Sequence, residues 1–357
     1  MLALPVPLIV SMILSYLGIR ATLRGRVHPG LLSLMALCAF QGVIIALVQY
    51  YGISNIRWIQ PLSASLIPPL CWLVFISTSR RPVSLKQDCI HVVAFLLCVI
   101  SLLFLPAALD IVVPLTFIFY GWKLMSAIAG GGDSLPNMRL ESGELPARLW
   151  QAIGMALLAS ALCDALIVLS QILGETTWTP MIVSLFTALN LLALGVLSLS
   201  DELTTVESPD DAIDDLPQID THESRSETRQ NTTAETNGAA VMNSEEAAHD
   251  SLIVQQLDAL MRDQQLYLDA DLTLSRLARR LSIPAKQLSA AINRHCSENV
   301  SRHVNRYRIE HACTLMLEGR SITQSVYDSG FNTRSNFNRE FQRIQQASPT
   351  EWLAVQT

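Results

Sequence analysis

Two patterns of apolar residues divide the chain. Up to about residue 200, apolar residues form runs of roughly twenty, the helix length that spans the ~30 Å hydrocarbon core of a bilayer. Beyond residue 250 they recur at every third or fourth position among polar residues, the spacing of helices that bury one face. The sequence therefore predicts an all-α protein with an N-terminal membrane domain and a C-terminal domain of short amphipathic helices.

Seven of the apolar runs are long enough to be membrane spans. They cover residues 3–19, 31–50, 61–78, 90–109, 111–128, 149–173 and 181–199. Together they predict a seven-helix transmembrane bundle over residues 1–200. Between the fourth and fifth runs only Asp110, flanked by Pro106 and Pro114, interrupts the apolar residues. This interruption favours a tight turn, with a re-entrant hairpin as the alternative.

The basic residues predict the orientation of this bundle. Loops one, three and five, with the adjacent end of the fifth span, hold nine Lys and Arg residues, and loops two, four and six hold only Arg57. Lys and Arg in short loops stay on the cytoplasmic side of a membrane. We therefore expect a multi-pass protein of the bacterial cytoplasmic (inner) membrane, with its N-terminus outside and its C-terminal domain in the cytoplasm.

Charge is distributed as unevenly as hydropathy. Residues 1–200 hold 10 Lys and Arg and 7 Asp and Glu, whereas residues 201–357 hold 15 and 24. A purely soluble enzyme is therefore excluded. Residues 201–250 contain 14 acids, two arginines and no aromatic residue, and such a segment cannot bury enough apolar surface to fold. We predict an acidic disordered linker over 201–250 and a separate C-terminal domain over 251–357.

Polar residues inside the spans are the candidates for sensing a signal. Asp164 lies deep in the sixth span, where an unpaired carboxylate costs ~3 kcal/mol, and Asn190 and Gln41 are predicted at a comparable depth. The alternative for Asp164 is a structural hydrogen bond between spans six and seven. Because the outer loops are too short to fold a ligand domain, the signal is expected to be a small or apolar molecule, or a membrane protein partner, read within the membrane lipid.

The sequence offers no sign of a cofactor or metal site. Its seven cysteines form no C-x-x-C pair, so we interpret them as reduced apolar residues rather than as disulfide or zinc positions. No catalytic acid, metal cluster or activated nucleophile accompanies Asp164, and an enzyme is not expected.

The C-terminal domain contains a two-helix pattern that occurs twice. In the first copy, Leu277 and Ala278 precede a turn at Ser282 and Ile283, and a second helix follows from Pro284. In the second copy, Ser321 and Gln324 form an S-x-x-Q capping box, and Gly330 suits a left-handed stop before a second helix. A longer helix, about 300–317, connects the copies. Two short helices joined by a tight turn are typical of a helix-turn-helix unit.

The second helix of each copy presents polar residues of the types that read DNA. Arg pairs with guanine edges and phosphates, and Asn pairs with adenine. A single polar helix face is usually only solvated, but the repetition on both second helices favours DNA binding. The candidate DNA-binding residues are Lys286, Gln287, Ser289, Asn293 and Arg294 in the first copy, and Arg334, Ser335, Asn336, Asn338, Arg339 and Arg343 in the second.

Three stretches of this domain resemble the AraC-type (AraC/XylS) transcription regulators. They are LTLSRLARRLSIPAKQLSAAINR, VNRYRIEHACTLML and SGFNTRSNFNREFQRIQQASPTEW, within about residues 271–352. The resemblance implies two helix-turn-helix units joined by a long helix, with double-stranded promoter or operator DNA and RNA polymerase as partners. It places Lys286 and Ser289 on base-reading positions of the first unit. In the second unit it places Arg334, Ser335, Asn336, Asn338 and Arg339 on or beside such positions. Departures at Ala290, Ile292 and Asn293 indicate that the second unit carries more of the specificity.

These observations predict a membrane-embedded one-component transcription regulator, in which a membrane sensor domain controls a tethered DNA-binding domain. A homodimer formed through the spans is one route to such control, because paired sites raise effective concentration. The alternative is a membrane receptor or transporter-like protein whose cytoplasmic helical domain binds another protein.

Overall fold

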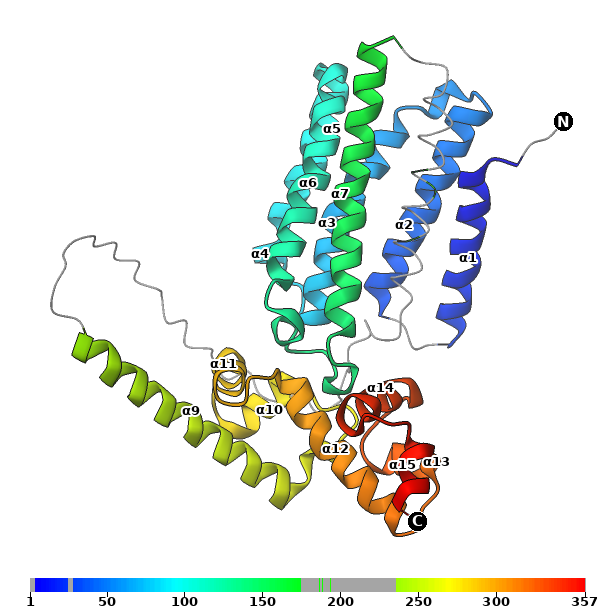
Figure 1. Cartoon of the computed structure of the whole chain (residues 1–357). Coiled ribbons are helices and arrows are strands. Elements are labelled where there is room, and N and C mark those ends of the chain that lie inside the picture. The colour runs from blue at the N-terminus through cyan, green and yellow to red at the C-terminus, as the bar shows by residue number, and fades with distance from the viewer. Residues whose placement is uncertain are drawn as a thin grey trace. The chain divides into compact units, whose positions relative to one another are not determined.

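The computed structural model describes residues 4–24, 28–174 and 236–356, together with the isolated positions 186, 188 and 193. These residues form two compact units, one on the N-terminal and one on the C-terminal side of the undescribed segment. All regular elements in the described ranges are helices (Figure 1). The protein is therefore all-α, as the sequence predicts.

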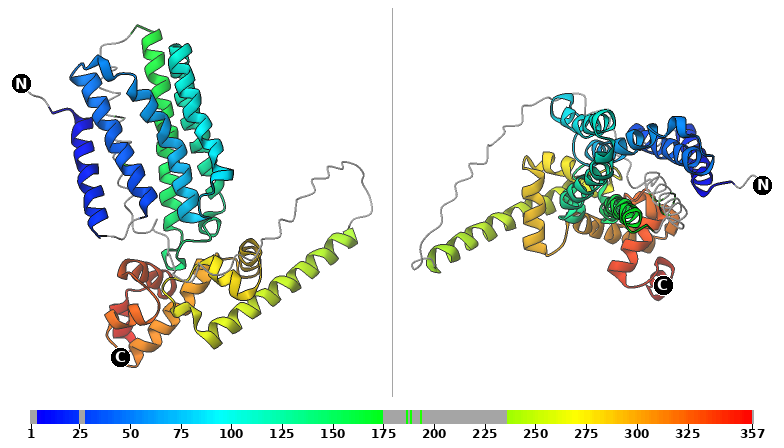
Figure 2. Two further views of the ribbon diagram at one scale, coloured as in Figure 1. Left: turned by 180° about the vertical axis from the view of Figure 1, so that it is seen from behind. Right: turned by 90° about the horizontal axis from the view of Figure 1, so that it is seen from above.

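Long helices of the N-terminal unit lie side by side as a bundle (Figures 1 and 2). The elements are α1 (Val6–Arg24), α2 (Pro29–Ile45), α3 (Ile59–Ser79), α4 (Leu85–Asp88), α5 (Val92–Phe104), α6 (Leu109–Ile128) and α7 (Leu145–Ile172). A π-helical segment, Ala46–Tyr50, extends α2, and 3-10 turns at Ser54–Ile56, Cys89–His91 and Pro106–Ala108 lie in the connections. Gly131–Ser134 and Leu140–Ser142 are further 3-10 turns between α6 and α7.

Six helices in the described ranges are long and apolar enough to cross a membrane. The segments are Val6–Leu23, Pro29–Tyr50, Ile59–Ser79, Lys86–Phe104, Pro106–Ile128 and Leu145–Ser170. They correspond to the first six predicted spans and indicate a multi-pass membrane protein. The seventh predicted span, 181–199, lies outside the described residues apart from isolated positions. Asp110 lies in the first turn of α6, next to the short 3-10 turn that separates α5 from α6, so the predicted tight turn is confirmed.

The two sides of these helices face different surroundings. Between the helices, Phe75 of α3 meets Trp150 of α7 edge-on, with ring centroids 5.2 Å apart, and both side chains are fully buried. The outer side of α5 instead exposes Leu97, Leu103 and Phe104, and only 17% of that candidate span is buried within the structure. Large exposed apolar faces of this kind are typical of helices that contact lipid.

The C-terminal unit is built from seven helices within residues 236–356. They are α9 (Thr236–Gln264), α10 (Leu274–Leu281), α11 (Ala285–Cys296), α12 (Val300–Leu317), α13 (Ile322–Asp328), α14 (Arg334–Gln345) and α15 (Pro349–Gln356). A 3-10 turn, Leu266–Leu268, lies between α9 and α10. The order predicted from the sequence, two short helix pairs joined by one long helix, is therefore present as α10–α11, α12 and α13–α14.

Helix α12 connects two packing regions of this unit. Its C-terminal half contributes Ile309, Ala312 and Met316 to a core that includes Phe337 and Phe341 of α14. On the other side, α9 packs along α11 and buries Ile253, Val254, Leu257 and Met261, which recur with the helical period. Each helix pair is thus held by its own set of apolar contacts.

The predicted linker, 201–250, lies largely outside the described residues. Its last part, 236–250, belongs to α9, which continues without a break into the C-terminal unit. The composition of this part predicts disorder, yet Asp250 at its end is almost fully buried against α11. The contact of α9 with α11 therefore begins before residue 251, and polar residues make it: His249 lies 2.9 Å from the Gln287 amide, and Asp250 pairs with Arg294.

Candidate nucleic-acid interface

The first helix pair forms a helix-turn-helix unit whose apolar side chains are buried. Leu277 and Ala278 of α10 and Leu288 and Ile292 of α11 are buried. Between the helices, Ser282 adopts a left-handed conformation with φ +56°. The turn predicted at Ser282 and Ile283 is therefore confirmed, and α11 begins directly after Pro284.

The polar residues of α11 do not share one exposed face. Lys286 and Asn293 are exposed, and Asn293 donates a hydrogen bond to the backbone oxygen of Ser289 at 3.0 Å. The prediction that Ser289 is presented outward is wrong, because its residue is only 9% exposed. Arg294 makes a bidentate ion pair with Asp250 of α9, with N···O distances of 2.6 and 2.9 Å. The Gln287 amide lies 2.9 Å from His249 of the same helix.

The second helix pair begins and ends where the sequence predicts. Ser321 and Gln324 form the expected capping box at the start of α13. Gly330 follows α13 with φ +86°, a conformation that favours glycine. Thr333 caps α14 by accepting a hydrogen bond from the Asn336 backbone N–H. Phe337 and Phe341 then bury one face of α14 completely.

Helix α14 exposes Arg334, Ser335, Asn338 and Arg339. The prediction that Asn336 lies outside is wrong, because this residue is 1% exposed. Asn336 and Glu340 are one turn apart, and both are buried beside the phenylalanines. The buried face of α14 is therefore wider than its apolar residues indicate.

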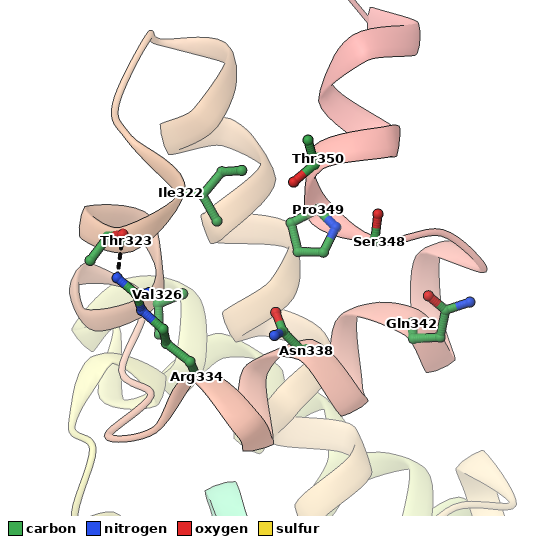
Figure 3. A pocket seen from close by; sticks show the side chains of 9 residues that line it. All are labelled: Ile322, Thr323, Val326, Arg334, Asn338, Gln342, Ser348, Pro349 and Thr350. Atoms are coloured by element: carbon green, nitrogen blue, oxygen red, sulfur yellow. Dashed lines mark hydrogen bonds between the residues drawn. The ribbon is translucent and has the colours of Figure 1, made fainter.

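A groove lined by both polar and apolar residues lies beside the exposed face of α14 (Figure 3). It has a volume of ≈ 440 Å³ and is formed by α13, α14 and the start of α15. Across it, the Arg334 guanidinium donates to the Thr323 hydroxyl at 2.6 Å. The lining residues are Ile322, Thr323, Val326, Arg334, Asn338, Gln342, Ser348, Pro349 and Thr350.

Three of the predicted DNA-binding arginines make ion pairs within the unit. Arg343 pairs with Glu340 at 2.9 Å and donates to the Arg302 backbone oxygen at 3.4 Å, and Arg339 lies 3.7 Å from the same Glu340. Arg294 pairs with Asp250 of α9. The Asp250 pair was not predicted, since the sequence gives no periodic signal for a carboxylate that pairs across 44 positions.

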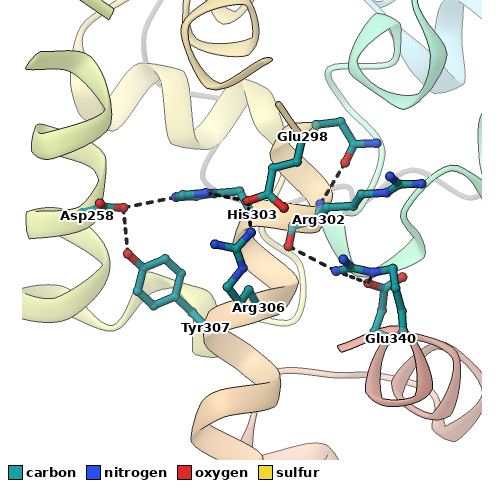
Figure 4. Close-up of polar contacts among 9 residues, drawn as sticks. Asp258, Glu298, Arg302, His303, Arg306, Tyr307 and Glu340 are labelled. Atoms are coloured by element: carbon teal, nitrogen blue, oxygen red, sulfur yellow. Dashed lines mark hydrogen bonds and ion pairs between the residues drawn. The ribbon is translucent and has the colours of Figure 1, made fainter. Parts of the chain in front are cut away.

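A cluster of polar side chains connects α9 to α12 (Figure 4). Asp258 of α9 accepts a hydrogen bond from the Tyr307 hydroxyl at 2.7 Å and lies 3.1 Å from Nε2 of His303. The other ring nitrogen of His303 lies 3.1 Å from Glu298. Burial and the Asp258 carboxylate together raise the pKa of Tyr307. The hydroxyl therefore stays protonated and donates to Asp258, which fixes the register of α9 on α12.

Arg294 affects the ionisation of Asp250. Its guanidinium holds the pKa of the Asp250 carboxyl below the ordinary value, against the opposing effect of burial. Such a group stabilises the folded state above its unfolded pKa of about 3.9, and this contribution is lost as the pH falls through the folded value. We therefore expect α9 to loosen from α11 as the pH drops below about 4.

Hydrogen exchange of α9 amides, corrected for the pH dependence of the intrinsic rate, measures this loosening. In the Asp250→Asn variant the acid-dependent part should be absent, because the titrating group has been removed. An identical pH dependence in both proteins would assign the effect to other carboxylates.

The sensing candidates are placed differently by the structure. Gln41 of α2 is buried, accepts a short hydrogen bond from Ser63, and donates to the Gln60 backbone oxygen at 3.3 Å. Asp164 is half-buried on α7, and Asn190 lies outside the described residues. The sequence did not predict the contacts of His91 and Lys123: His91 lies 2.8 Å from the Tyr120 hydroxyl, and the Lys123 ammonium is 4.3 Å from the Trp72 ring centre.

Within residues 4–24, 28–174 and 236–356, no group of three His, Cys, Asp or Glu side chains is arranged to hold a metal ion. The exposed basic and amide side chains of the two second helices include Lys286, Asn293 and Arg294 on α11, and Arg334, Asn338 and Arg339 on α14.

Comparison with known proteins supports this interpretation. Residues 277–354 match a family described as a helix-turn-helix domain. No curated protein and no solved structure matches the chain. The match begins within α10 and ends within α15, so it covers both helix pairs and the helix between them. Residues 277–354 are therefore an AraC-type helix-turn-helix DNA-binding domain, and the six long apolar helices found among the described residues indicate a membrane-associated transcription regulator.

Proposed function

We propose that the protein is a membrane-embedded one-component regulator that binds specific double-stranded DNA through both helix-turn-helix units under the control of its membrane domain. The observation that carries this proposal is the repetition of one architecture. Helices α11 and α14 each follow a short helix, each expose basic and amide side chains, and are joined through α12. Two recognition helices of this kind fit successive major grooves, about 34 Å apart.

The second unit is proposed to carry most of the base discrimination. Arg334, Asn338 and Arg339 are exposed on α14, and Arg pairs well with guanine. On α11, Lys286, Asn293 and Arg294 are exposed, but Arg294 is also held in its ion pair with Asp250 of α9, and Gln287 contacts His249 of α9. Fewer side chains of α11 are therefore available for base edges.

We also propose the domain organisation and topology inferred from the sequence. Residues 1–200 form a seven-span sensor, 201–250 an acidic linker and 251–357 the DNA-binding domain. The distribution of basic residues, nine on one side and Arg57 on the other, supports an N-terminus outside and a C-terminal domain in the cytoplasm of a bacterial inner membrane. Asp164, Asn190 and Gln41 remain the proposed signal-sensing positions, and RNA polymerase and a second copy of the chain the proposed protein partners.

The test is selection of DNA by the full-length protein reconstituted in lipid nanodiscs. Repeated selection from random DNA should enrich one sequence, and footprinting should protect two adjacent major grooves of it. If the helical domain instead binds another protein, as in the alternative function, no sequence will be enriched above the level of nonspecific binding.

Replacement of Arg339 with alanine is expected to cost ~1–3 kcal/mol of discrimination between the selected site and a site altered at one guanine. The loss follows if Arg339, which is exposed on α14, reads that base. Binding titrations on both DNAs measure it. Arg343→Ala is the matched control, because Arg343 lies on the same helix, pairs with the same Glu340 at 2.9 Å rather than 3.7 Å, and also donates to the Arg302 backbone oxygen. An equal loss on every DNA would show that Arg339 contacts only phosphate.

A further inference from the structure

Helix α9 is the first helix of the C-terminal unit, and it begins within the predicted linker. It begins at Thr236, and its second half is part of the DNA-binding unit. There it buries Ile253, Leu257 and Met261, and Asp258 connects it to Tyr307 of α12. The helix is therefore placed to affect the first helix-turn-helix unit directly.

The contact of α9 with α11 has a polar end. Asp250 is 3% exposed, and both of its carboxylate oxygens accept hydrogen bonds from Arg294. One residue earlier, His249 lies 2.9 Å from the Gln287 amide. Burying a carboxylate is costly unless it is paired, so the position of Asp250 depends on Arg294.

The faces of α11 show that this contact is separate from the outward face. Gln287 and Arg294 are seven residues apart and therefore lie on one side of the helix. Lys286 and Asn293 are also seven apart and lie about 100° away around the helix axis. Gln287 and Arg294 contact α9, with the Arg294 side chain still 57% exposed, whereas Lys286 and Asn293 are exposed on the neighbouring side of the helix.

We propose that Asp250 and Arg294 form a positioning pair, through which the linker-proximal end of α9 sets the orientation of the first recognition helix, and that Arg294 does not contact DNA. This inference rests on the proposed function. Any partner or signal that orders or displaces α9 would then change the orientation of α11 in the first helix-turn-helix unit. The second unit keeps its own core of α12, α13 and α14 residues.

The experiment compares single and double amide variants in the full-length protein in nanodiscs, by footprinting on the selected site. Asp250→Asn and Arg294→Gln each leave one buried charge or one guanidinium without its ionic partner. Each should weaken protection of the first groove about tenfold or more. Protection of the second groove should change by less than about twofold, because its core is separate.

The double variant D250N/R294Q removes both charges and leaves two amides that can bond to one another. It should recover first-groove protection to within about threefold of the wild-type level, since replacing both members of a pair is far less costly than replacing one. Asp263→Asn, an exposed acid on the same helix, is the matched control and should change neither groove.

Failure of the double variant to recover would overturn the inference, because it would mean that Arg294 itself contacts DNA. Loss of both grooves in either single variant would also overturn it, by assigning the pair to the stability of the whole unit. A wild-type protein that protects no groove would refute DNA recognition itself, and is distinguished from these outcomes in the same gel.

Discussion

Replacing Arg308 with leucine is expected to lower the free energy of unfolding of the C-terminal unit by about 3 kcal/mol or more. The Arg308 side chain is completely buried. Its guanidinium donates to the backbone oxygens of Tyr267 at 2.6 Å and Asp269 at 2.7 Å, and lies 5.6 Å from the Phe331 ring centre. Leucine supplies none of these hydrogen bonds, and a buried carbonyl that loses its donor costs ~1–3 kcal/mol.

Hydrogen exchange of α12 amides in the full-length protein measures this loss. A change of about 3 kcal/mol corresponds to roughly a hundredfold faster exchange through opening of the unit. Arg306→Leu is the matched control, because Arg306 lies on the same helix and is half exposed in its pair with Glu298. Because the Arg306 guanidinium is partly hydrated, its loss is expected to cost less than the loss of the fully buried Arg308. Equal effects at the two positions would contradict a structural role for Arg308.

Replacing Gly330 with alanine is expected to be similarly destabilising, by ~3 kcal/mol or more. The residue has φ +86°, which costs an L-residue ~1–2 kcal/mol by itself. A Cβ atom there would also overlap the backbone oxygen of Tyr267 and lie 2.9 Å from that of Leu268. Because both neighbours are backbone atoms, relief requires movement of the segment that Arg308 holds.

Gly319→Ala separates the two contributions. Gly319 has φ +87°, but a Cβ atom built there meets nothing within 4 Å. Its replacement should therefore show only the conformational cost of ~1–2 kcal/mol. The difference in stability between the two variants is measured by thermal unfolding and by hydrogen exchange of the same α12 amides. If both variants lose equal stability, the close approach of Gly330 to the Tyr267 carbonyl does not contribute to the loss.

The sequence is sufficient to predict elements whose signal is local. Membrane spans follow from run length alone, and six of the seven predicted runs appear as long apolar helices in the described residues. The capping box at Ser321 and the glycine stop at Gly330 depend on residues only a few positions apart. Phe337 and Phe341 are recognised because apolar residues one turn apart mark a buried face.

Periodicity assigns polar residues to the surface, yet Ser289 and Asn336, which were predicted to be exposed, are buried, as are Glu340 and Arg308. The burial of Arg308 depends on hydrogen-bonding partners outside its own helix, such as the Tyr267 carbonyl, 41 positions away. Pairings over such separations leave no mark in the local pattern. The same holds for Asp250, whose partner Arg294 lies on another helix and whose neighbourhood has the composition of a linker.

The single helix α12 has a consequence for how this gene can change. It is 18 residues long, so it spans about 27 Å, and it is the rigid spacer between both recognition elements. Adding or deleting one residue in α12 would rotate one recognition helix by ~100° relative to the other. The bases of an operator that both recognition helices contact can therefore change during evolution. The spacing between the two halves of the operator cannot change in the same way, because the length of α12 fixes it.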